Sequence, residues 1–296
     1  MAWSGGGRGR RGRRWALALA AGLGLALVAP APGRAVEPGL KHSMTPASLG
    51  LTAEAVSFPA ADSVAVAGWW LPGPEKSPVV VVAARGTGTM ADMLPAAREF
   101  LARGFTVLTF EYRGFGPAAS AEAVDSLRHV LLNTQWVGEM LGALRYARAR
   151  GGAHVFAWGQ DLGSAVALAA AARERASCDA VAVEGLFRTT QEAMLANGTS
   201  VLHDLQVRHR RLVDGRDEPF SAANRLRCPL FVVLAGKDVV TPVAETRTVV
   251  GRVRGRADTW ELPEAGHAGA EATPGYFDRL AKWFRQWTAF PPGGGR

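Results

Sequence analysis

The sequence predicts one α/β domain with a mainly parallel, eight-stranded sheet and helices on both faces of that sheet. Three observations support this prediction. Short apolar runs alternate along the chain with segments of helical periodicity. Several runs are apolar without interruption, which is typical of strands that are covered on both faces. A chain of 296 residues that is 48% hydrophobic and 20% charged is also long enough for one large α/β domain.

The predicted elements alternate in order along the chain. A turn near residues 60–62 joins the first two predicted strands. In the helix predicted for 133–150, Trp136, Met140 and Leu144 recur on one face. Parallel sheets of this kind bind ligands at the carboxyl ends of their strands, so the candidate site residues are sought there. The predicted strands are 54–58, 63–71, 78–83, 105–110, 155–158, 180–183, 230–234 and 257–262, and the main helices are 90–103, 133–150, 165–175, 242–253 and 276–287.

Residues 1–35 are predicted to be a secretory signal peptide. A Gly/Arg-rich start is followed by an apolar run over 15–28 and by small residues up to Ala35, where cleavage is expected. The alternative is an uncleaved N-terminal anchor, although this run is short for a membrane span. The protein is therefore expected to be exported, periplasmic or secreted, with membrane contact only through this segment if it stays uncleaved.

The positive charge of the chain is concentrated in the same segment. The formal net charge is +8, but the first 35 residues hold six arginines and no acid, which leaves +2 for the remainder. The basic balance is therefore no sign of a nucleic-acid partner, and none is expected.

The rest of the chain is predicted to contain one folded domain. Residues 36–51 are a surface lead-in rich in Pro, Ser and Gly, 52–290 form the domain, and 291–296 are a disordered tail. Within the domain, periodicity is lost over about 186–227, where polar and charged residues gather. That segment is predicted to be a small cap over the edge of the sheet.

Two cysteines allow a disulfide in an exported protein. Cys178 and Cys228 each precede a predicted strand, so they share one end of the sheet if those strands are parallel neighbours. A bridge and a pair of buried thiols are equally good expectations, because the sequence does not provide the short Cα separation that a disulfide requires.

The stretch Gly159-Gln160-Asp161-Leu162-Gly163 stands between a predicted strand and an Ala-rich predicted helix. A glycine on each side of one reactive side chain is typical of a nucleophile elbow, because the strained turn crowds the neighbouring backbone. Serine usually occupies the central position, and here it is Asp161. Ser164 is the nearest hydroxyl, but one turn into the helix it is expected to point elsewhere.

Two further candidates follow later strands, Asp238 and His267. The chain order of nucleophile, acid and histidine is that of one class of hydrolytic triad. We therefore predict that Asp161, His267 and Asp238 form a catalytic site. The alternatives are a helix N-cap role for Asp238 and an exposed turn for His267. Two carboxylates beside one histidine would favour the imidazolium form.

From about 52 to 288 the chain resembles α/β-hydrolases, in particular compact serine hydrolases related to serine aminopeptidases and depalmitoylating thioesterases. Residues 111–116, 184–187 and 228–238 are similar to that family's loops, reading Glu-Tyr-Arg-Gly-Phe-Gly, Glu-Gly-Leu-Phe and Cys-Pro through Gly-Lys-Asp. The resemblance implies the α/β-hydrolase fold, no cofactor and no metal.

One loop of the chain departs from that family. Where the family has His-Gly and an oxyanion-hole residue, this chain has Arg85-Gly86-Thr87. The backbone N–H groups of Thr87 and Leu162 are still expected to form the oxyanion hole, because main-chain donors do not depend on the missing histidine.

The carboxylate at Asp161 changes the expected chemistry. It is already ionised and needs no base, but attack on an ester carbonyl would give an anhydride, a poor intermediate. An electrophilic saturated carbon is the better target. Attack of a carboxylate on such a carbon resembles the chemistry of epoxide hydrolases and haloalkane dehalogenases. Their cap tyrosines are missing, since Tyr112, Tyr146 and Tyr276 lie outside 186–227, and Leu162 stands where a halide-binding tryptophan is usual.

The sequence thus predicts an exported, monomeric or weakly oligomeric hydrolase that acts on a small-molecule substrate of unknown identity. The alternative is a catalytically silent protein of the same fold that binds a ligand or a partner in the same cleft.

Overall fold

The computed structural model describes residues 37–119, 133–190, 192–193 and 214–292. All of them belong to Pro32–Arg296, the larger of the two compact units of the chain. The predicted signal peptide, positions 191 and 194–213 of the predicted cap and the last four residues of the predicted tail lie outside the described residues. Within the described part, no helix has both the length and the apolar character needed to cross a membrane.

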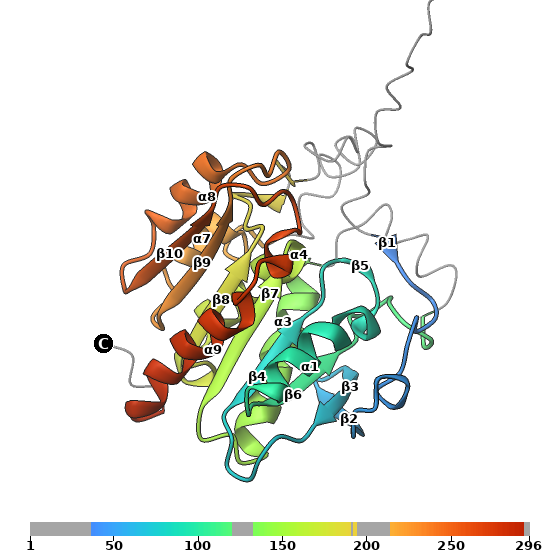
Figure 1. Cartoon of the computed structure of the whole chain (residues 1–296). Helices are drawn as coiled ribbons and strands as arrows, with labels where there is room; N and C mark the ends of the chain where they lie inside the picture. Colours follow the sequence, from blue (N-terminus) through green and yellow to red (C-terminus); the bar gives the residue numbers. More distant parts are fainter. Residues whose placement is uncertain (1–36, 120–132, 191, 194–213, 293–296) are drawn as a thin grey trace, which may run out of the picture. The chain divides into compact units, whose positions relative to one another are not determined.

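The core of the unit is an eight-stranded sheet in the order β10-β9-β8-β7-β4-β6-β3-β2 (Figure 1). The strands β2 and β6 each pair antiparallel with β3, and all other neighbours in this sheet are parallel. The predicted mainly parallel, eight-stranded sheet is confirmed. The strands are β2 (Glu54–Pro59), β3 (Ala65–Leu71), β4 (Val79–Ala83), β6 (Thr106–Phe110), β7 (Val155–Gln160), β8 (Ala180–Glu184), β9 (Leu230–Ala235) and β10 (Ala257–Leu262).

Helices cover both faces of this sheet (Figure 1). On one face α1 and α9 pack together, with Phe100 of α1 in edge contact with Phe277 of α9. On the other face α3 packs against α4, and the first ten residues of the Ala-rich α4 are all buried. The α-helices are α1 (Leu94–Ala102), α3 (Asn133–Ala149), α4 (Leu162–Arg173), α7 (Pro219–Ala223), α8 (Val243–Val250) and α9 (Tyr276–Gln286), and the 3-10 helices are η1 (Ala47–Leu49), η2 (Met90–Met93), η3 (Arg175–Ser177), η4 (Ala270–Ala272) and η5 (Trp287–Ala289).

Two local features differ from the sequence prediction. The lead-in contributes a short strand, β1 (Glu37–Pro38), which pairs in parallel with β5 (Thr87–Gly88). Neither strand could be predicted from hydrophobic periodicity, because a strand of two residues is too short to show a period. Helix α4 also begins three residues earlier than the predicted 165, since the turn at Asp161 leads directly into its first residue.

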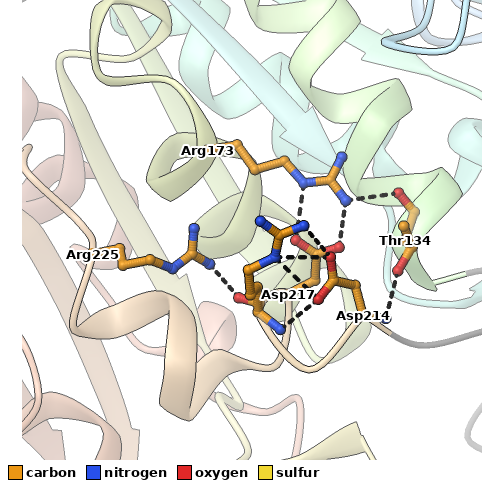
Figure 2. A network of polar contacts seen from close by, with 6 residues as sticks. Thr134, Arg173, Asp214, Asp217 and Arg225 are labelled. Carbon is orange, nitrogen blue, oxygen red and sulfur yellow. Dashed lines mark hydrogen bonds and ion pairs between the residues drawn. The ribbon is translucent and has the colours of Figure 1, made fainter. Parts of the chain in front are cut away.

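Polar contacts anchor residues 214–217, which lie in the C-terminal part of the predicted cap (Figure 2). Arg173 of α4 donates to both carboxylate oxygens of Asp217 and to the carbonyl of Thr134 in α3. The N–H of Asp214 donates to Oγ1 of Thr134 at 2.9 Å. These bonds hold residues 214–217 against α3 and α4.

The two described ends of the predicted cap are also joined to each other. The backbone N–H and the hydroxyl of Thr190 donate to one carboxylate oxygen of Glu218, at 2.7 and 3.0 Å. The N–H of Phe220 donates to the carbonyl of Arg188 at 3.1 Å. The described residues on both sides of 194–213 are thus bonded to each other, and residues 214–217 are bonded to α3 and α4.

Cys178 and Cys228 are both buried, free thiols. They precede the parallel neighbours β8 and β9, so they share one end of the sheet as expected. Burial raises the pKa of the Cys178 thiol well above its ordinary value, and a hydrogen bond with Cys228 adds to the rise. The two side chains are therefore adjacent, and a bridge in the exported protein stays a prediction.

Thiol counting decides between the two alternatives for this pair. Unfolded, unreduced protein that has been isolated after export should give no titratable thiol if the bridge forms, and two after reduction. Two thiols without reduction would contradict the disulfide. A Cys178→Ser variant, which must give one thiol in either case, calibrates the assay.

Candidate functional site

The turn at Asp161 has the strained backbone of a nucleophile elbow. Asp161 follows β7, precedes α4 and has φ 51° and ψ −120°, a conformation that non-glycine residues seldom adopt. A Cβ atom on Gly159 would lie 2.2 Å from the carbonyl oxygen of Gly163, and one on Gly163 would lie 2.5 Å from that of Ala83. Both flanking positions therefore require glycine, which is the physical basis of the sequence pattern.

The three predicted site residues lie together at the carboxyl end of the sheet. His267 lies in the loop after β10, with its Nε2 3.4 Å from Oδ1 of Asp161. Its Nδ1 lies 3.0 Å from Oδ2 of Asp238, in the loop after β9. The imidazole ring is thus placed between two carboxylates, one on each side.

The loop around Asp238 holds its carboxylate in one orientation. Oδ1 accepts the N–H groups of Val240 and Thr241, both at 2.8 Å, and Oδ2 accepts the hydroxyl of Thr241 at 2.6 Å. Burial alone would raise the pKa of Asp238, but the hydrogen bonds from His267 and Thr241 outweigh it and the pKa is lowered. Asp238 is therefore held as a carboxylate. The N-cap of α8 is Pro242, so Asp238 does not have the N-cap role that was its alternative.

The pKa values of the other two groups, Asp161 and His267, are both raised. Burial raises the pKa of Asp161 to about 6, against the opposing charges of His267 and Arg85. The hydrogen bond to Asp238 raises the pKa of His267, burial opposes this, and the charge of Asp161 adds to the rise. This electrostatic environment favours the imidazolium form of His267.

The chain resembles solved structures at low sequence identity. The Pyrococcus furiosus esterase Pf2001 superposes with a TM-score of 0.68 at 16% identity, over 85% of this chain and 99% of that chain. The α/β hydrolase GrgF from Penicillium sp. sh18 gives 0.62 at 17% identity, over 81% and 100% of the two chains. The 2,6-dihydroxy-pseudo-oxynicotine hydrolase gives 0.65 at 16% identity, over 83% and 72%. The sequence matches no protein-family model and no curated protein.

The chain has the α/β-hydrolase fold. Identities this low establish the fold alone, and the site has to be interpreted from its own geometry. The fold prediction from the sequence is confirmed.

The two positions predicted for an oxyanion hole lie at adjacent strand ends of this α/β-hydrolase fold. Leu162 is the first residue of α4, so its N–H has no partner within the helix. Thr87 lies in β5, shortly after β4 ends at Ala83. The strands β4 and β7 are parallel neighbours, which brings their two following loops to the same edge.

A partly buried polar network adjoins the elbow, and the sequence did not predict it. Arg85 donates through Nε to Oε1 of Gln160 at 2.7 Å and through Nη2 to Oε1 of Glu271 at 2.6 Å. The side-chain N–H of Gln160 donates to Glu184 at 2.8 Å. Arg85, which the sequence marked only as a departure from the family, therefore links the loop after β4 to the last residue of β7.

Glu184 is the centre of this network and is buried with 1% of its surface exposed. Besides Gln160, it accepts the N–H of Ala270 at 3.1 Å and the hydroxyl of Tyr276 at 2.9 Å. Ala270 follows His267 by three residues, so the network supports the histidine loop. The available sequence signal was a polar residue at the end of two otherwise apolar strands, Gln160 in β7 and Glu184 in β8.

Replacing Glu184 by alanine should lower the free energy of unfolding by about 3 kcal/mol, because the Ala270 N–H and the Tyr276 hydroxyl lose their acceptor and the Gln160 amide keeps only a long contact with Glu271. Chemical denaturation at neutral pH measures this loss. Glu264→Ala is the matched control, since Glu264 is exposed and its ion pair with Lys237 lies at the surface. Equal stability of the two variants would show that Glu184 does not support the site.

Other hydroxyl groups near the elbow are engaged elsewhere. Ser164 is buried, and its hydroxyl donates to the carbonyl of Asp161 at 2.6 Å, so it cannot replace the nucleophile. The hydroxyl of Tyr112 donates to the carbonyl of Ala84 at 3.2 Å. Trp158 is fully buried in the core.

A cavity of about 240 Å³ lies between the base of the predicted cap and the Asp238 loop. Its walls include the apolar side chains of Phe187, Val239, Val240 and Pro242. Phe187 lies two residues beyond Gly185, whose backbone is so close to Asp161 that a Cβ atom there would lie 2.5 Å from Oδ1. Two of the residues that line the cavity are therefore close in sequence to residues of the site: Val239 follows Asp238, and Phe187 follows Gly185 by two positions.

The raised pKa of Asp161 predicts a pH-dependent gain in stability for Asp161→Asn. The ordinary pKa is 3.8 and the folded one about 6, so the proton on Asp161 stabilises the fold below pH 4, and this contribution is lost as the pH rises through 6. At pH 8 the variant should be more stable than the wild type by on the order of 2 kcal/mol, and at pH 3 the two should be equal. Thermal and urea unfolding over that range test this, with Asp278→Asn as an exposed control.

Proposed function

We propose that this protein is a hydrolase that uses Asp161 as a carboxylate nucleophile against a saturated carbon. His267 is its general base, and Asp238 is the group that orients the base. The observation that supports this proposal is the position of His267, with Nε2 3.4 Å from Asp161 and Nδ1 3.0 Å from Asp238. In a covalent mechanism the second step needs a histidine that can remove a proton from water beside the ester and that is oriented by an acid. The position of His267 between Asp161 and Asp238 meets both requirements.

In the first step an oxygen of Asp161 attacks the electrophilic carbon. A C–O bond forms as the bond to the leaving group breaks, and the leaving group departs with its electron pair. The product is an alkyl ester on Asp161. No base is needed for this step, because the attacking group is already an anion above a pH of about 6.

In the second step Nε2 of His267 removes a proton from water, and the hydroxide adds to the carboxyl carbon of Asp161. The N–H groups of Leu162 and Thr87 stabilise the negative charge that develops on oxygen. The tetrahedral species then collapses, the alkoxide takes the proton from His267, and an alcohol leaves. Asp161 is left as a carboxylic acid, and release of its proton to solvent restores the carboxylate.

Ester formation would itself activate the base. In the resting site the negative charge of Asp161 helps to raise the pKa of His267. An alkyl ester carries no charge, so the first step removes one of the two carboxylates that favour the imidazolium. His267 would then lose its proton more readily at the stage when a neutral imidazole is needed.

The cavity at the base of the predicted cap has a wall residue, Val239, that directly follows Asp238, and its largely apolar walls favour a substrate with a small hydrophobic group. Its volume of about 240 Å³ is below that of pockets for drug-sized ligands, so it suits a short alkyl chain or a single ring. Its charged wall residues Arg188, Glu192 and Glu245 are paired with one another. We therefore propose a neutral, apolar substituent on the electrophilic carbon.

We also propose that the protein acts after export, as a monomer or weak oligomer, and with no cofactor in its reaction. The proposed steps use Asp161, His267, Asp238, the backbone N–H groups of Leu162 and Thr87, and water. N-terminal sequencing of the secreted or periplasmic protein tests the export proposal, with cleavage near Ala35 as the expected result.

Turnover of a panel of epoxides, haloalkanes and p-nitrophenyl esters tests the hydrolase proposal. We expect activity on an epoxide or a haloalkane with a small apolar substituent, and its loss in Asp161→Ala. If nothing in the panel is converted, and Asp161→Ala and His267→Ala leave the binding of small apolar alcohols unchanged, the hydrolase proposal fails. The catalytically silent alternative then gains support if those alcohols bind the cavity.

A further inference from the structure

The lead-in segment 37–44 lies against the loop that carries the predicted oxyanion-hole residue Thr87. Its strand β1 pairs in parallel with β5, so that Glu37 is opposite Thr87. The N–H of Gly39 then donates to the carbonyl of Gly88 at 2.7 Å, and the N–H of Gly116 donates to the carbonyl of Gly39 at 2.8 Å. We refer to residues 37–44 as the lead-in clip.

A partly buried acid, Glu111, joins the clip to the start of the helix that follows this loop. Nε2 of His42 lies 2.8 Å from Oε2 of Glu111, and Oε1 of Glu111 accepts the N–H of Met90 at 3.0 Å. Glu111 directly follows β6, and its own N–H donates to the carbonyl of Ala67 in β3. The ring of His42 also contacts that of Trp69, with centroids 4.7 Å apart. His42 is thus tied to the end of the central sheet.

The next clip residue contacts the same loop from another side. The hydroxyl of Ser43 donates to Oδ1 of Asp92 at 2.7 Å. The other carboxylate oxygen of Asp92 accepts the N–H of Thr89 at 2.7 Å and closes the N-terminal cap of η2. Ser43 therefore fixes the acid that holds the residues immediately after Thr87 and Gly88.

The loop needs such external contacts, because its own sequence gives it freedom. Gly86 and Gly88 stand on either side of Thr87 with φ of 87° and 74°. Glycine adopts these and many other conformations at little cost. The orientation of the Thr87 N–H is therefore set by what the loop is bonded to. Leu162 is different, because its N–H begins a buried helix.

We propose that the lead-in clip is a positioning element of the active site, and that His42 and Ser43 hold Thr87 where its N–H meets the negative oxygen of the tetrahedral intermediate. This inference rests on the proposed function. It divides the oxyanion hole into a donor fixed by the core of the fold and a donor fixed by the N-terminal segment. The clip acts on ester hydrolysis, since that step places negative charge on a carboxyl oxygen of Asp161.

The test compares the double variant His42→Ala/Ser43→Ala with the wild type and with Lys41→Ala, a change at an exposed neighbouring position. Hydrogen exchange of amides 85–92 is measured first, with amides of β9 as an internal standard. We expect exchange in the loop to rise roughly tenfold in the double variant and to stay unchanged in Lys41→Ala.

The second readout separates the two chemical steps by quenched-flow mass spectrometry of the Asp161 ester. The double variant should hydrolyse the ester roughly tenfold more slowly than the wild type, with an unchanged rate of ester formation. A variant that merely weakens the fold would slow both steps. Glu111→Gln, which keeps an acceptor for the Met90 N–H, should retain most of the wild-type rate.

Unchanged loop exchange in the double variant overturns the proposal, and so does faster exchange with an unchanged rate of ester hydrolysis. Failure of the wild type to form any ester contradicts the proposed function instead. The exchange measurement is independent of turnover, so it still decides in that case whether His42 and Ser43 hold the loop.

Discussion

His267→Gln is expected to stop the reaction after its first step and to leave the alkyl group of the substrate on Asp161. The attacking carboxylate needs no base, so the ester should still form. Its hydrolysis needs a water that has lost a proton to Nε2, and a glutamine cannot accept that proton. Steady-state turnover should fall by about 10³-fold, and mass spectrometry of the digested protein should find the added alkyl mass on the peptide that contains Asp161.

His154→Gln is the matched control, because His154 precedes β7 at the opposite end of that strand from Asp161. It should turn over at the wild-type rate and accumulate no ester. A His267→Gln protein that loses activity without any adduct would contradict the covalent mechanism. An adduct on a residue other than Asp161 would assign the nucleophile elsewhere.

Asp161→Ser is expected to convert the site into an esterase. The elbow keeps its two glycines, and a serine hydroxyl there lies near Nε2 of His267, whose ring is already oriented by Asp238. The substitution also removes one carboxylate that favours the imidazolium, so His267 becomes a better base. Hydrolysis of p-nitrophenyl acetate should rise by about 10²-fold or more over the wild type, with the rate increasing as the pH passes the pKa of His267.

The double variant Asp161→Ser/His267→Ala controls for unspecific hydrolysis and should return to the wild-type background. Haloalkane or epoxide turnover should be lost in Asp161→Ser, since a neutral hydroxyl does not displace these leaving groups. An inactive Asp161→Ser protein with wild-type stability would show that the oxyanion donors are misplaced for ester chemistry.

The candidate site could be predicted at the positions where chain order and local turn geometry suffice. Gly159 and Gly163 identify the elbow, because any side chain there would collide with backbone. Asp238 and His267 follow β9 and β10, the last two strands in the chain, which gives the order nucleophile, acid and histidine. Each of these patterns is visible within a short stretch of sequence, and parallel strands bring their carboxyl ends to one edge whatever the details of packing.

The supporting contacts could not be predicted, because they join residues far apart in the chain. Arg85 bonds to Glu271, 186 positions later, and His42 bonds to Glu111 across 69 positions. Such pairs have no spacing or period in the sequence. Their partners become visible only when the sheet brings the strand ends together.

The sequence by itself determined the α/β-hydrolase fold, the position of the elbow and the identity of three candidate side chains. Hydrophobic periodicity and the Gly159-to-Gly163 pattern each span a short stretch of sequence, so they can be followed along the chain. The tertiary structure decided that His267 lies between two carboxylates and that the lead-in pairs with β5. It also decided that Glu184 bonds to both Gln160, next to the elbow, and Ala270, next to the histidine loop. Charge and hydrogen bonding depend on distances through space, and only the folded sheet sets those distances.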